Sequence, residues 1–233
     1  IKPSSLEIGK VLETQIMFGL FILLKLSKLS CIIFNLFIVS SLMIKKKFKL
    51  FFITEKLKEL NLDYVKKIGA ILILRNIHNF DKKNLEEFNR NCNKRNIKIF
   101  ISNDVKTLFL LKSNNFYISA HNKKHFKNLK RINPNIQIIG SAHNVSEINE
   151  KIKQGCNLIV LSRIFNTSNK YKKGHLGTTK FNLLTRNLKS KFIALGGINE
   201  KNFRSMKMLN ITGCAMLKDK KKAGKYMPAF FKK

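Results

Sequence analysis

A loop rich in lysine, threonine and glycine is the first stretch of the sequence whose residue types could do chemistry. It reads RIFNTSNKYKKGHLG, from Arg163 to Gly177, and it follows the apolar segment CNLIVLS. Thr167 and Lys170 offer a hydroxyl and an ammonium group to a phosphate, and this composition suits a phosphate-binding loop at the mouth of a barrel. The same composition is also typical of a surface loop in a lysine-rich protein. The rest of the chain has to decide between the two.

A second candidate is the glycine pair in GGIN, residues 196–199. Gly196 and Gly197 have no side chains, so their backbone N–H groups can approach an oxyanion closely. By itself the pair is also the sequence of an ordinary turn before a helix. The place of the pair in the chain favours a phosphate-binding role, because the pair comes at the end of the seventh of eight apolar segments. Barrels of parallel strands often bind phosphate in the loops after strands seven and eight.

These eight apolar segments alternate with polar stretches of helical length. They are residues 49–54, 70–75, 97–102, 116–119, 136–141, 158–162, 192–197 and 213–217. Segments that are apolar throughout and alternate with helices predict parallel strands that are buried on both faces. Eight such units predict an α/β fold, a compact (β/α)8 TIM barrel, since typical barrels have about 250 residues. An open doubly wound sheet is the alternative, but no GxGxxG motif follows the first segment to support it.

In a barrel, the functional face is the one formed by the carboxyl ends of the strands and the loops after them. Polar residues follow the predicted strands at this face: Asn103 and Asp104 after the third, Ser141 and His143 at the fifth, Thr167 and Lys170 after the sixth, and Gly196–Asn199 after the seventh. A barrel would bring all of them to one mouth.

The net charge of +33 raises the question of a nucleic-acid partner. Lysine is spread over the expected helices and loops, and there is no arginine-rich or aromatic RNA-binding signature. We therefore expect a solvated basic surface with weak attraction to polyanions and no specific nucleic-acid partner. A C-terminal aromatic cluster, Tyr226, Phe230 and Phe231, is compatible with a cap on the barrel or with a partner subunit, so a homo-oligomer stays open.

Cys31, Cys92, Cys156 and Cys214 are scattered without CxxC spacing. This spacing argues against a metal site or a disulfide framework. A reducing cytoplasm is the expected location.

The N-terminal segment differs in character from the remainder. Residues 16–44 are strongly apolar, and a membrane helix needs about 20 such residues, but two lysines interrupt the middle of the segment. MIKKKFKLFFIT, which begins at Met43, is typical of a cytosolic N-terminus that leads into a first strand. We expect residues 1–42 to be an apolar extension that stems from an over-extended reading frame or, alternatively, serves as a membrane anchor. Residues 43–233 are expected to form the barrel.

Four stretches carry a resemblance to a known family: ISNDVKTLFLL, IIGSAHNVSEI, SRIFNTSNKYKKGHLG and FIALGGINEKN, in this order. They resemble thiamine-phosphate synthase and its TenI-type relatives. In that family one strand ends in Asn-Asp and a later one in Ser-x-His, and a Phe-x-Thr-x-Thr-Lys loop and a Leu-Gly pair follow. The chain then closes with Ala-Ile-Gly-Gly-Ile and a Gly-Ala-x-Gly-x-Ala strand. The resemblance covers residues 47–217, and the order and spacing of the motifs make the set specific.

The resemblance implies an enzyme of thiamine diphosphate biosynthesis that joins hydroxymethylpyrimidine diphosphate to thiazole phosphate and expels pyrophosphate. Such chemistry needs cations at the leaving group and backbone donors at the thiazole phosphate. The resemblance implies that Lys170 and Thr167 bind pyrophosphate, that Arg75 and Asn103 contact the diphosphate, and that Asp104 binds Mg²⁺. It implies that Gly196 and Gly197 bind the thiazole phosphate and that Gly177 of the Leu-Gly pair contributes to substrate binding. Ser141 would lie near the reacting centre. Ligation by oxygen alone of a metal carried by a diphosphate is what Mg²⁺ prefers.

The chain departs from the family's pattern at four positions. Ile73 and Ile77 stand for a glutamine and a lysine near the second strand, Asn122 for a second Mg²⁺ carboxylate, and Asn169 for the second loop threonine. Two alternatives to the synthase therefore stay open. One is a TenI-type thiazole tautomerase, in which His143 would act as the catalytic acid–base, a role that suits imidazole because its pKa lies near neutrality. The other is a degenerate barrel that only binds a phosphorylated thiazole.

Overall fold

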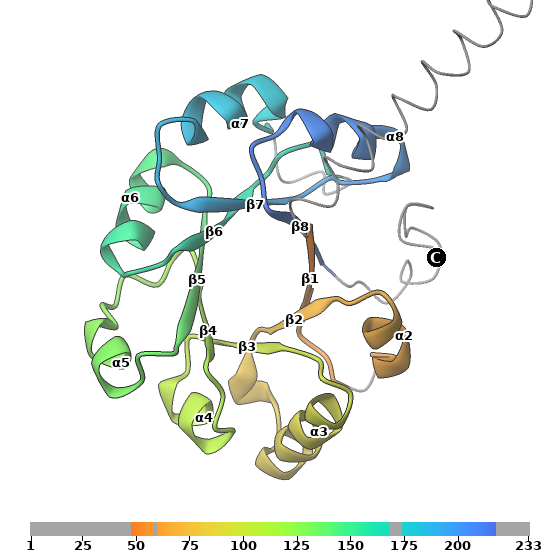
Figure 1. Ribbon diagram of the computed structural model, residues 1–233, viewed down its shortest axis with the longest axis vertical. Coiled ribbons are helices and arrows are strands. Elements are labelled where there is room, and N and C mark those ends of the chain that lie inside the picture. Colours follow the sequence, from red (N-terminus) through yellow and green to blue (C-terminus); the bar gives the residue numbers. More distant parts are fainter. Residues whose placement is uncertain (1–47, 58–59, 168–173, 218–233) are drawn as a thin grey trace, which may run out of the picture. The chain divides into compact units, whose positions relative to one another are not determined.

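The computed structural model describes residues 48–57, 60–167 and 174–217 of the chain. Within these residues, eight parallel strands pair each with the next, and β8 pairs with β1 to close a barrel (Figure 1). The strands are β1 (Lys49–Thr54), β2 (Ile71–Leu74), β3 (Ile99–Ser102), β4 (Asn115–Ile118), β5 (Gln137–Ala142), β6 (Leu158–Ser162), β7 (Lys191–Leu195) and β8 (Gly213–Leu217). The predicted (β/α)8 barrel is confirmed, and the open doubly wound sheet is excluded because the sheet has no free edge.

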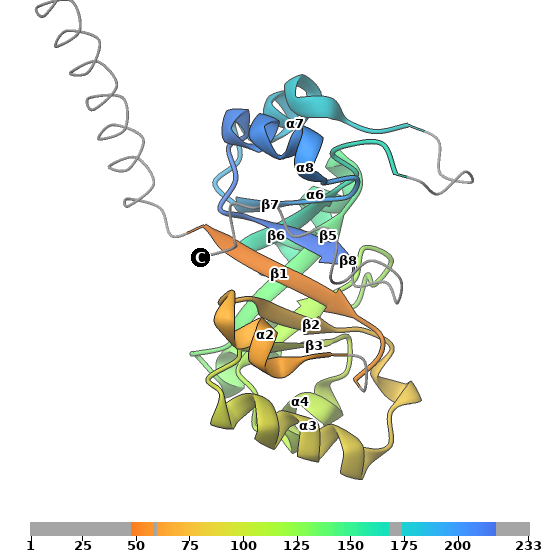
Figure 2. The ribbon, with the colours of Figure 1, turned by 90° about the vertical axis from the view of Figure 1, so that its right-hand side faces the viewer.

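Helices fill the connections between successive strands and cover the outside of the barrel (Figure 2). They are α2 (Leu62–Lys67), α3 (Lys82–Lys94), α4 (Val105–Leu110), α5 (Lys127–Ile132), α6 (Val145–Lys153), α7 (Gly177–Thr185) and α8 (Glu200–Phe203), with the 3-10 turns η1 (Ile77–Asn79) and η2 (Arg204–Met208). In α3 the Asp81 side chain caps the first turn by accepting a hydrogen bond from the Asn84 backbone N–H. Leu85, Phe88 and Cys92 are the buried residues of α3, and their spacing puts them on one face toward the strands.

The buried apolar side chains form two layers, as strand alternation requires. One layer receives side chains from every strand and fills the barrel; it consists of Phe51, Ile53, Ile73, Phe100, Tyr117, Ile139, Val160, Ile193 and Ala215. The larger layer combines the intervening strand residues with the inner faces of the helices, for example Leu72 on β2 with Phe88 on α3. The barrel interior is thus a packed core with no room for a ligand, and barrels of this kind bind their ligands at the carboxyl ends of the strands.

The predicted strand boundaries hold within a few residues, and those of β1, β6 and β8 are unchanged. The seventh apolar segment, residues 192–197, extends beyond its strand, because β7 ends at Leu195. Gly196 and Gly197 have φ angles of +102° and +68°, a left-handed conformation that a strand cannot continue through. The pair therefore belongs to the loop at the carboxyl end of β7.

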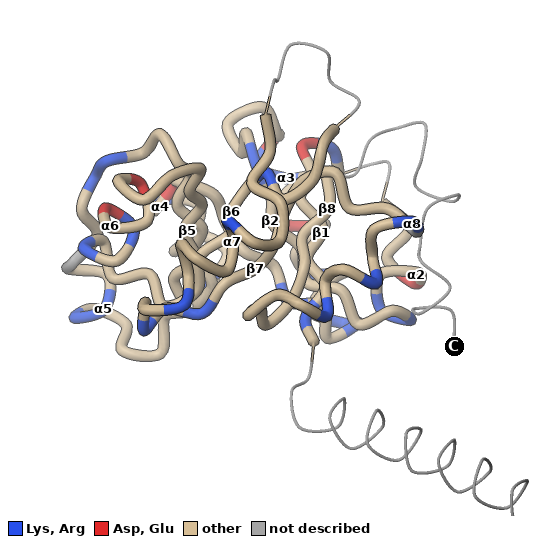
Figure 3. The backbone as a smooth tube through the Cα atoms, turned by 90° about the horizontal axis from the view of Figure 1, so that it is seen from above, with Lys and Arg blue, Asp and Glu red and all other residues tan. Residues whose placement is uncertain are grey.

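Several predictions about the surroundings of the barrel remain predictions. Among the described residues no helix is long and apolar enough to cross a membrane, and residues 16–44 and the C-terminal aromatic cluster lie outside them. Figure 3 shows lysine and arginine scattered over several helices and loops. The division at residue 42, the cytoplasmic location, the homo-oligomer and the lack of a specific nucleic-acid partner are not tested by the fold.

The cysteines of the described segments are buried in the packing between strands and helices. Cys92, Cys156 and Cys214 are free thiols. Burial raises the pKa of each of them to about 12. These thiols are therefore protonated and unreactive near neutral pH.

Candidate functional site

The carboxyl ends of the strands present a polar rim above the apolar interior. Side chains two residues apart point to the same face of a strand. Two residues beyond the interior side chains of five strands, this face therefore bears polar residues. The interior residues are Ile73, Phe100, Tyr117, Ile139 and Val160, and the polar residues that follow them are Arg75, Ser102, Ser119, Ser141 and Ser162. Ser102, Ser141 and Ser162 are 7%, 8% and 8% exposed, so their hydroxyls border the packed interior. One guanidinium and a row of hydroxyls thus converge where a barrel binds its ligands.

Tyr117 links two of the predicted site residues. Its ring belongs to the interior layer and is 3% exposed. Burial raises the pKa of the Tyr117 phenol, and a hydrogen bond with the Ser141 side chain and the charge of Arg75 partly oppose that rise. Arg75 also lies 3.8 Å from a carboxylate oxygen of Glu55. Arg75, just after β2, and Ser141, on β5, therefore both influence the ionisation of one buried phenol.

Asn103 is held by the loop that follows β4. It has a left-handed φ of +60°, which asparagine tolerates better than most residues. Its Nδ2 donates to the Ser119 hydroxyl at 2.9 Å, and its Oδ1 accepts from the Ser119 backbone N–H at 3.0 Å and from Asn122 Nδ2 at 3.0 Å. Asn122, the predicted replacement for a metal carboxylate, is thus a hydrogen-bond donor to Asn103.

Asp104 caps helix α4. One of its carboxylate oxygens accepts from the Thr107 backbone N–H at 3.2 Å and the other from the Thr107 hydroxyl at 2.7 Å. Each oxygen of an ionised carboxylate has about two acceptor sites, so both keep capacity for a further ligand. Asp104 is half-buried at the rim and next to Asn103.

The residue types around Asp104 determine which kind of metal site this part of the rim could form. Among the described residues, no group of three His, Cys, Asp or Glu side chains is arranged to hold a metal ion. A single carboxylate suits Mg²⁺ only where the ion arrives with substrate phosphates, which is how Mg²⁺ usually binds in enzymes. The residues therefore fit a magnesium diphosphate and do not fit a metal held by protein ligands alone.

His143 lies on the same rim in a cluster with Glu147 and His121. Glu147 accepts from the His143 backbone N–H at 2.8 Å and lies 2.9 Å from its ring Nδ1. The His121 ring stacks on that of His143 with 6.0 Å between centroids. His121 is exposed, and the loop after β4 brings it to the candidate site.

The loop after β6 folds back against the end of its own strand. The backbone N–H groups of Leu176 and Gly177 donate to the carbonyls of Arg163 and Ile164 at 2.8 and 2.9 Å. Arg163 Nη1 lies 3.5 Å from the Thr167 hydroxyl. Lys170 lies outside the described residues, so its predicted role stays a prediction.

The glycine pair after β7 packs against this loop. The Phe165 backbone N–H donates to the Gly196 carbonyl at 3.1 Å. A Cβ on Gly196 would lie 2.9 Å from Arg163 Cγ, and one on Gly197 would lie 2.5 Å from the Phe165 carbonyl oxygen and overlap that of Asn166. A side chain at Gly197 would thus collide with the main chain of the loop after β6.

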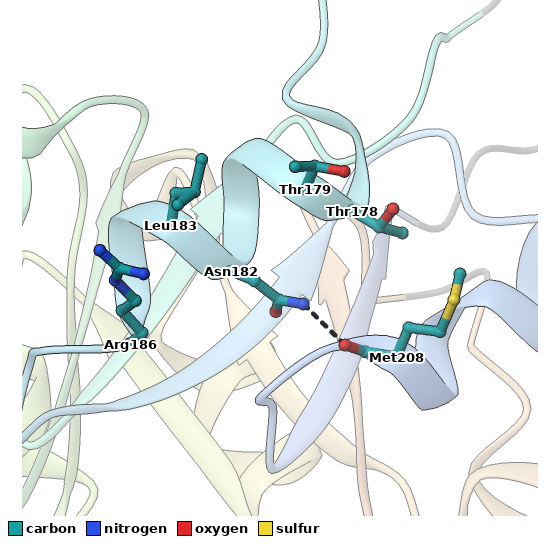
Figure 4. Close-up of a pocket in the computed structure, with 6 residues that line it drawn as sticks. All are labelled: Thr178, Thr179, Asn182, Leu183, Arg186 and Met208. Atoms are coloured by element: carbon teal, nitrogen blue, oxygen red, sulfur yellow. Dashed lines mark hydrogen bonds between the residues drawn. The ribbon is translucent and has the colours of Figure 1, made fainter.

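An open depression on the outer surface involves none of these residues. Thr178, Thr179, Asn182, Leu183 and Arg186 of α7 line it together with Met208 (Figure 4). The Asn182 side chain donates to the Met208 carbonyl at 2.7 Å, which ties α7 to η2. The depression lies between α7 and η2, and none of the rim side chains lines it, so the rim is the better candidate site.

Comparison with known proteins agrees with the motifs on this rim. A family model described as thiamine monophosphate synthase matches residues 54–219. The chain belongs to the thiamine monophosphate synthase family. A thiamine-phosphate synthase from Prochlorococcus marinus subsp. pastoris is 30% identical over 181 residues, which cover 73% of this chain and 50% of that protein. Another from Prochlorococcus marinus strain AS9601 is 29% identical over 51% of this chain and 34% of that protein. The chain thus spans about half the length of these relatives or less.

Solved structures support the fold. Thiamine phosphate pyrophosphorylase from Pyrococcus furiosus superposes with a TM-score of 0.57 at 18% identity, over 75% of this chain and 87% of that one. N-(5'-phosphoribosyl)anthranilate isomerase from Pyrococcus furiosus gives a TM-score of 0.55 at 13% identity, over 79% and 95%. Since barrels with different names fit about equally well, these similarities speak for the architecture and not for the reaction.

Tyr117, Ser119 and Arg163 are among the rim residues that were not singled out from the sequence. Tyr117 stands in an apolar run and was counted as strand core. Strand alternation could have placed Ser119 two residues beyond it on the same face. Arg163 directly follows a strand, which is the position that a barrel uses for its site.

Proposed function

We propose that the barrel carries out the reaction of its family, in which hydroxymethylpyrimidine diphosphate and thiazole phosphate are joined and pyrophosphate is released. The observation that carries the proposal is the position of Arg163. Its side chain lies between Thr167 and Gly196, on two loops that the family resemblance assigns to phosphate groups. A guanidinium group in this position suits an anion better than any neutral ligand.

The thiazole phosphate would bind at the glycine pair. Within the described residues, neither the N–H of Gly196 nor that of Gly197 makes a hydrogen bond to the main chain. Both are held in left-handed conformations by contact with the loop after β6. Two backbone donors beside the Arg163 guanidinium would then share one phosphate.

The diphosphate would bind across the rim, near Arg75, Asn103 and Asp104. Asp104 is the residue that would hold Mg²⁺ together with diphosphate oxygens, where the ion would offset charge on the leaving pyrophosphate. Asn103 keeps a fixed orientation because Ser119 and Asn122 hold its amide. Arg75 supplies a permanent positive charge from β2.

The reacting centre would lie between these two ends, above Tyr117 and Ser141. The bond between the pyrimidine methylene and the diphosphate breaks, its electron pair leaves with pyrophosphate, and the thiazole ring bonds to the methylene carbon. The hydroxyl of Ser141 and the buried phenol of Tyr117 would offer dipoles to the charge that develops there.

Calorimetric titration of the two ends separately tests the proposal. Thiazole phosphate alone and inorganic pyrophosphate with Mg²⁺ should each bind, and neither should compete with the other. No heat from thiazole phosphate at millimolar concentration would count against both the synthase and the tautomerase. Binding of thiazole phosphate without binding of magnesium pyrophosphate would favour the tautomerase or the degenerate barrel.

A further inference from the structure

A buried lysine under the rim has no part in the reaction proposed above. Lys151 lies near the end of α6 and is 0% exposed. Its Nζ donates to the Asn122 carbonyl at 2.7 Å and to Gln154 Oε1 at 2.8 Å. Burial lowers the pKa of Lys151, since the interior disfavours the charged form.

Gln154 completes the same set of contacts. It is 1% exposed, and its Nε2 donates to the carbonyls of Asn122 and Lys124 at 2.8 and 3.0 Å. Lys151 and Gln154 thus bind the carbonyls of Asn122 and Lys124 in the loop between β4 and α5, residues 119–126. The stem of Lys151 lies over β5, where a Cβ on Gly140 would be 2.9 Å from its Cγ and Cδ.

Residues 119–126 connect the contacts of Lys151 and Gln154 to Asn103 at the rim. The Asn122 backbone N–H donates to the Ser119 carbonyl at 3.1 Å, and Asn122 Oδ1 accepts from the Lys124 backbone N–H at 2.9 Å. With its backbone fixed on both sides, Asn122 presents Nδ2 to Asn103 Oδ1 at 3.0 Å. Asn103 is next to Asp104, so a continuous path of hydrogen bonds joins Lys151 to the diphosphate end.

Stability alone does not explain a lysine at this position. A buried ammonium is costly, and an apolar side chain of similar volume is often as stable or more so. The ammonium instead favours one conformation of the loop, because it keeps both hydrogen bonds only while the Asn122 carbonyl and the Gln154 side chain stay in this arrangement.

We propose that Lys151 and Gln154 are positioning residues for the diphosphate end of the site, and that they act by holding residues 119–126 in the arrangement that orients Asn103. This inference rests on the proposed function for its ligand, a diphosphate carried with a divalent cation. The arrangement of the loop itself is independent of that function.

The test compares Lys151→Met with Lys153→Met, an exposed lysine on the same helix. Without ligand, amide hydrogen exchange in residues 119–126 and at Asn103 should speed up in Lys151→Met only, while the strands stay protected. Outer-shell partners typically change affinity or activity by 10- to 100-fold, so magnesium pyrophosphate should bind about 10-fold more weakly to Lys151→Met. Thiazole phosphate, which binds at the opposite end, should bind as it does to the unaltered protein.

Three results would overturn the inference: unchanged exchange in the loop, faster exchange with unchanged pyrophosphate binding, or an equal loss of both ligands. If Lys151→Met does not fold, Gln154→Met removes two donors to the same loop and is judged by the same results. An unaltered protein that binds neither ligand contradicts the proposed function, and the exchange measurement then decides the loop arrangement on its own.

Discussion

Glu147 accepts two hydrogen bonds from His143 through a single carboxylate oxygen, one from the backbone N–H at 2.8 Å and one from ring Nδ1 at 2.9 Å. The other oxygen lies 3.3 Å from the Asn144 side-chain amide, whose own oxygen caps α6 at the Glu147 N–H. The first turn of α6 thereby fixes the His143 ring at the rim. A carboxylate at the start of a helix also interacts favourably with its dipole.

Replacing Glu147 by glutamine should make stability less dependent on acid pH. Burial raises the pKa of Glu147, but hydrogen bonds from the His143 ring and backbone, with the charges of His143 and His121, lower it below its ordinary value of 4.5 overall. The stabilisation is therefore present above pH 4.5 and is lost as the pH falls through the lower pKa of the folded state. Urea unfolding of both proteins should differ at neutral pH and converge in acid. Glu87→Gln on exposed α3 surface is the control, and a difference that stays constant with pH would contradict the role of the charge.

Asp104 can be tested separately as a helix cap and as a metal ligand. Asparagine is as good an N-cap as aspartate, so Asp104→Asn should leave stability nearly unchanged, whereas Asp104→Ala should cost about 1 kcal/mol. If Asp104 also holds Mg²⁺, both variants should lose affinity for magnesium pyrophosphate. Chemical denaturation and calorimetry measure the two effects. Normal pyrophosphate binding by Asp104→Asn would reduce Asp104 to a cap.

Gly197→Ala should be more destabilising than Gly69→Ala. Both glycines have positive φ, +68° and +63°, so each alanine variant pays roughly 1–2 kcal/mol for that conformation. A Cβ on Gly69 meets nothing within 4 Å, whereas one on Gly197 collides with the carbonyls of Phe165 and Asn166. Denaturant unfolding should show the excess cost, and thiazole phosphate should bind Gly197→Ala more weakly. Equal destabilisation by the two variants would show that the contact between the loops is unimportant.

Arg163→Gln should weaken thiazole-phosphate binding. Hydrogen bonds to charged groups contribute about 1.5–3 kcal/mol, so a loss of about 10- to 100-fold in affinity is expected. Arg186→Gln, at the outer depression on α7, is the matched control because it removes the same charge from the chain. Titration calorimetry at low and high salt compares them. If both variants lose affinity equally and only at low salt, the effect is one of net charge.

The fold could be predicted because its signal repeats along the chain. Each apolar segment is ambiguous alone, but eight of them in alternation with helices leave few other architectures. The side chains around Asn103 were also foreseen in part, since its neighbour across the rim, Asn122, was recognised from the family pattern.

Other features depend on contacts that sequence spacing does not reveal. Lys151 is one of 46 lysines and arginines, and nothing in its helix distinguishes a buried lysine from the solvated ones around it. His121 reaches His143 only because the loop after β4 turns toward β5. The collision of a Gly197 Cβ with the loop after β6 could not be foreseen, because the direction of a Cβ is set by φ and ψ, which the residue type does not specify.

Release of pyrophosphate from hydroxymethylpyrimidine diphosphate, with thiazole phosphate and Mg²⁺ present, tests the central claim most directly. The account predicts release that requires both substrates. It also predicts that Lys170→Ala lowers the rate by about 10²–10³, the usual effect of removing one group that stabilises charge in the transition state, with little change in thiazole-phosphate binding. Absence of pyrophosphate release, together with interconversion of thiazole tautomers that is lost in His143→Ala, would contradict the synthase and establish the tautomerase.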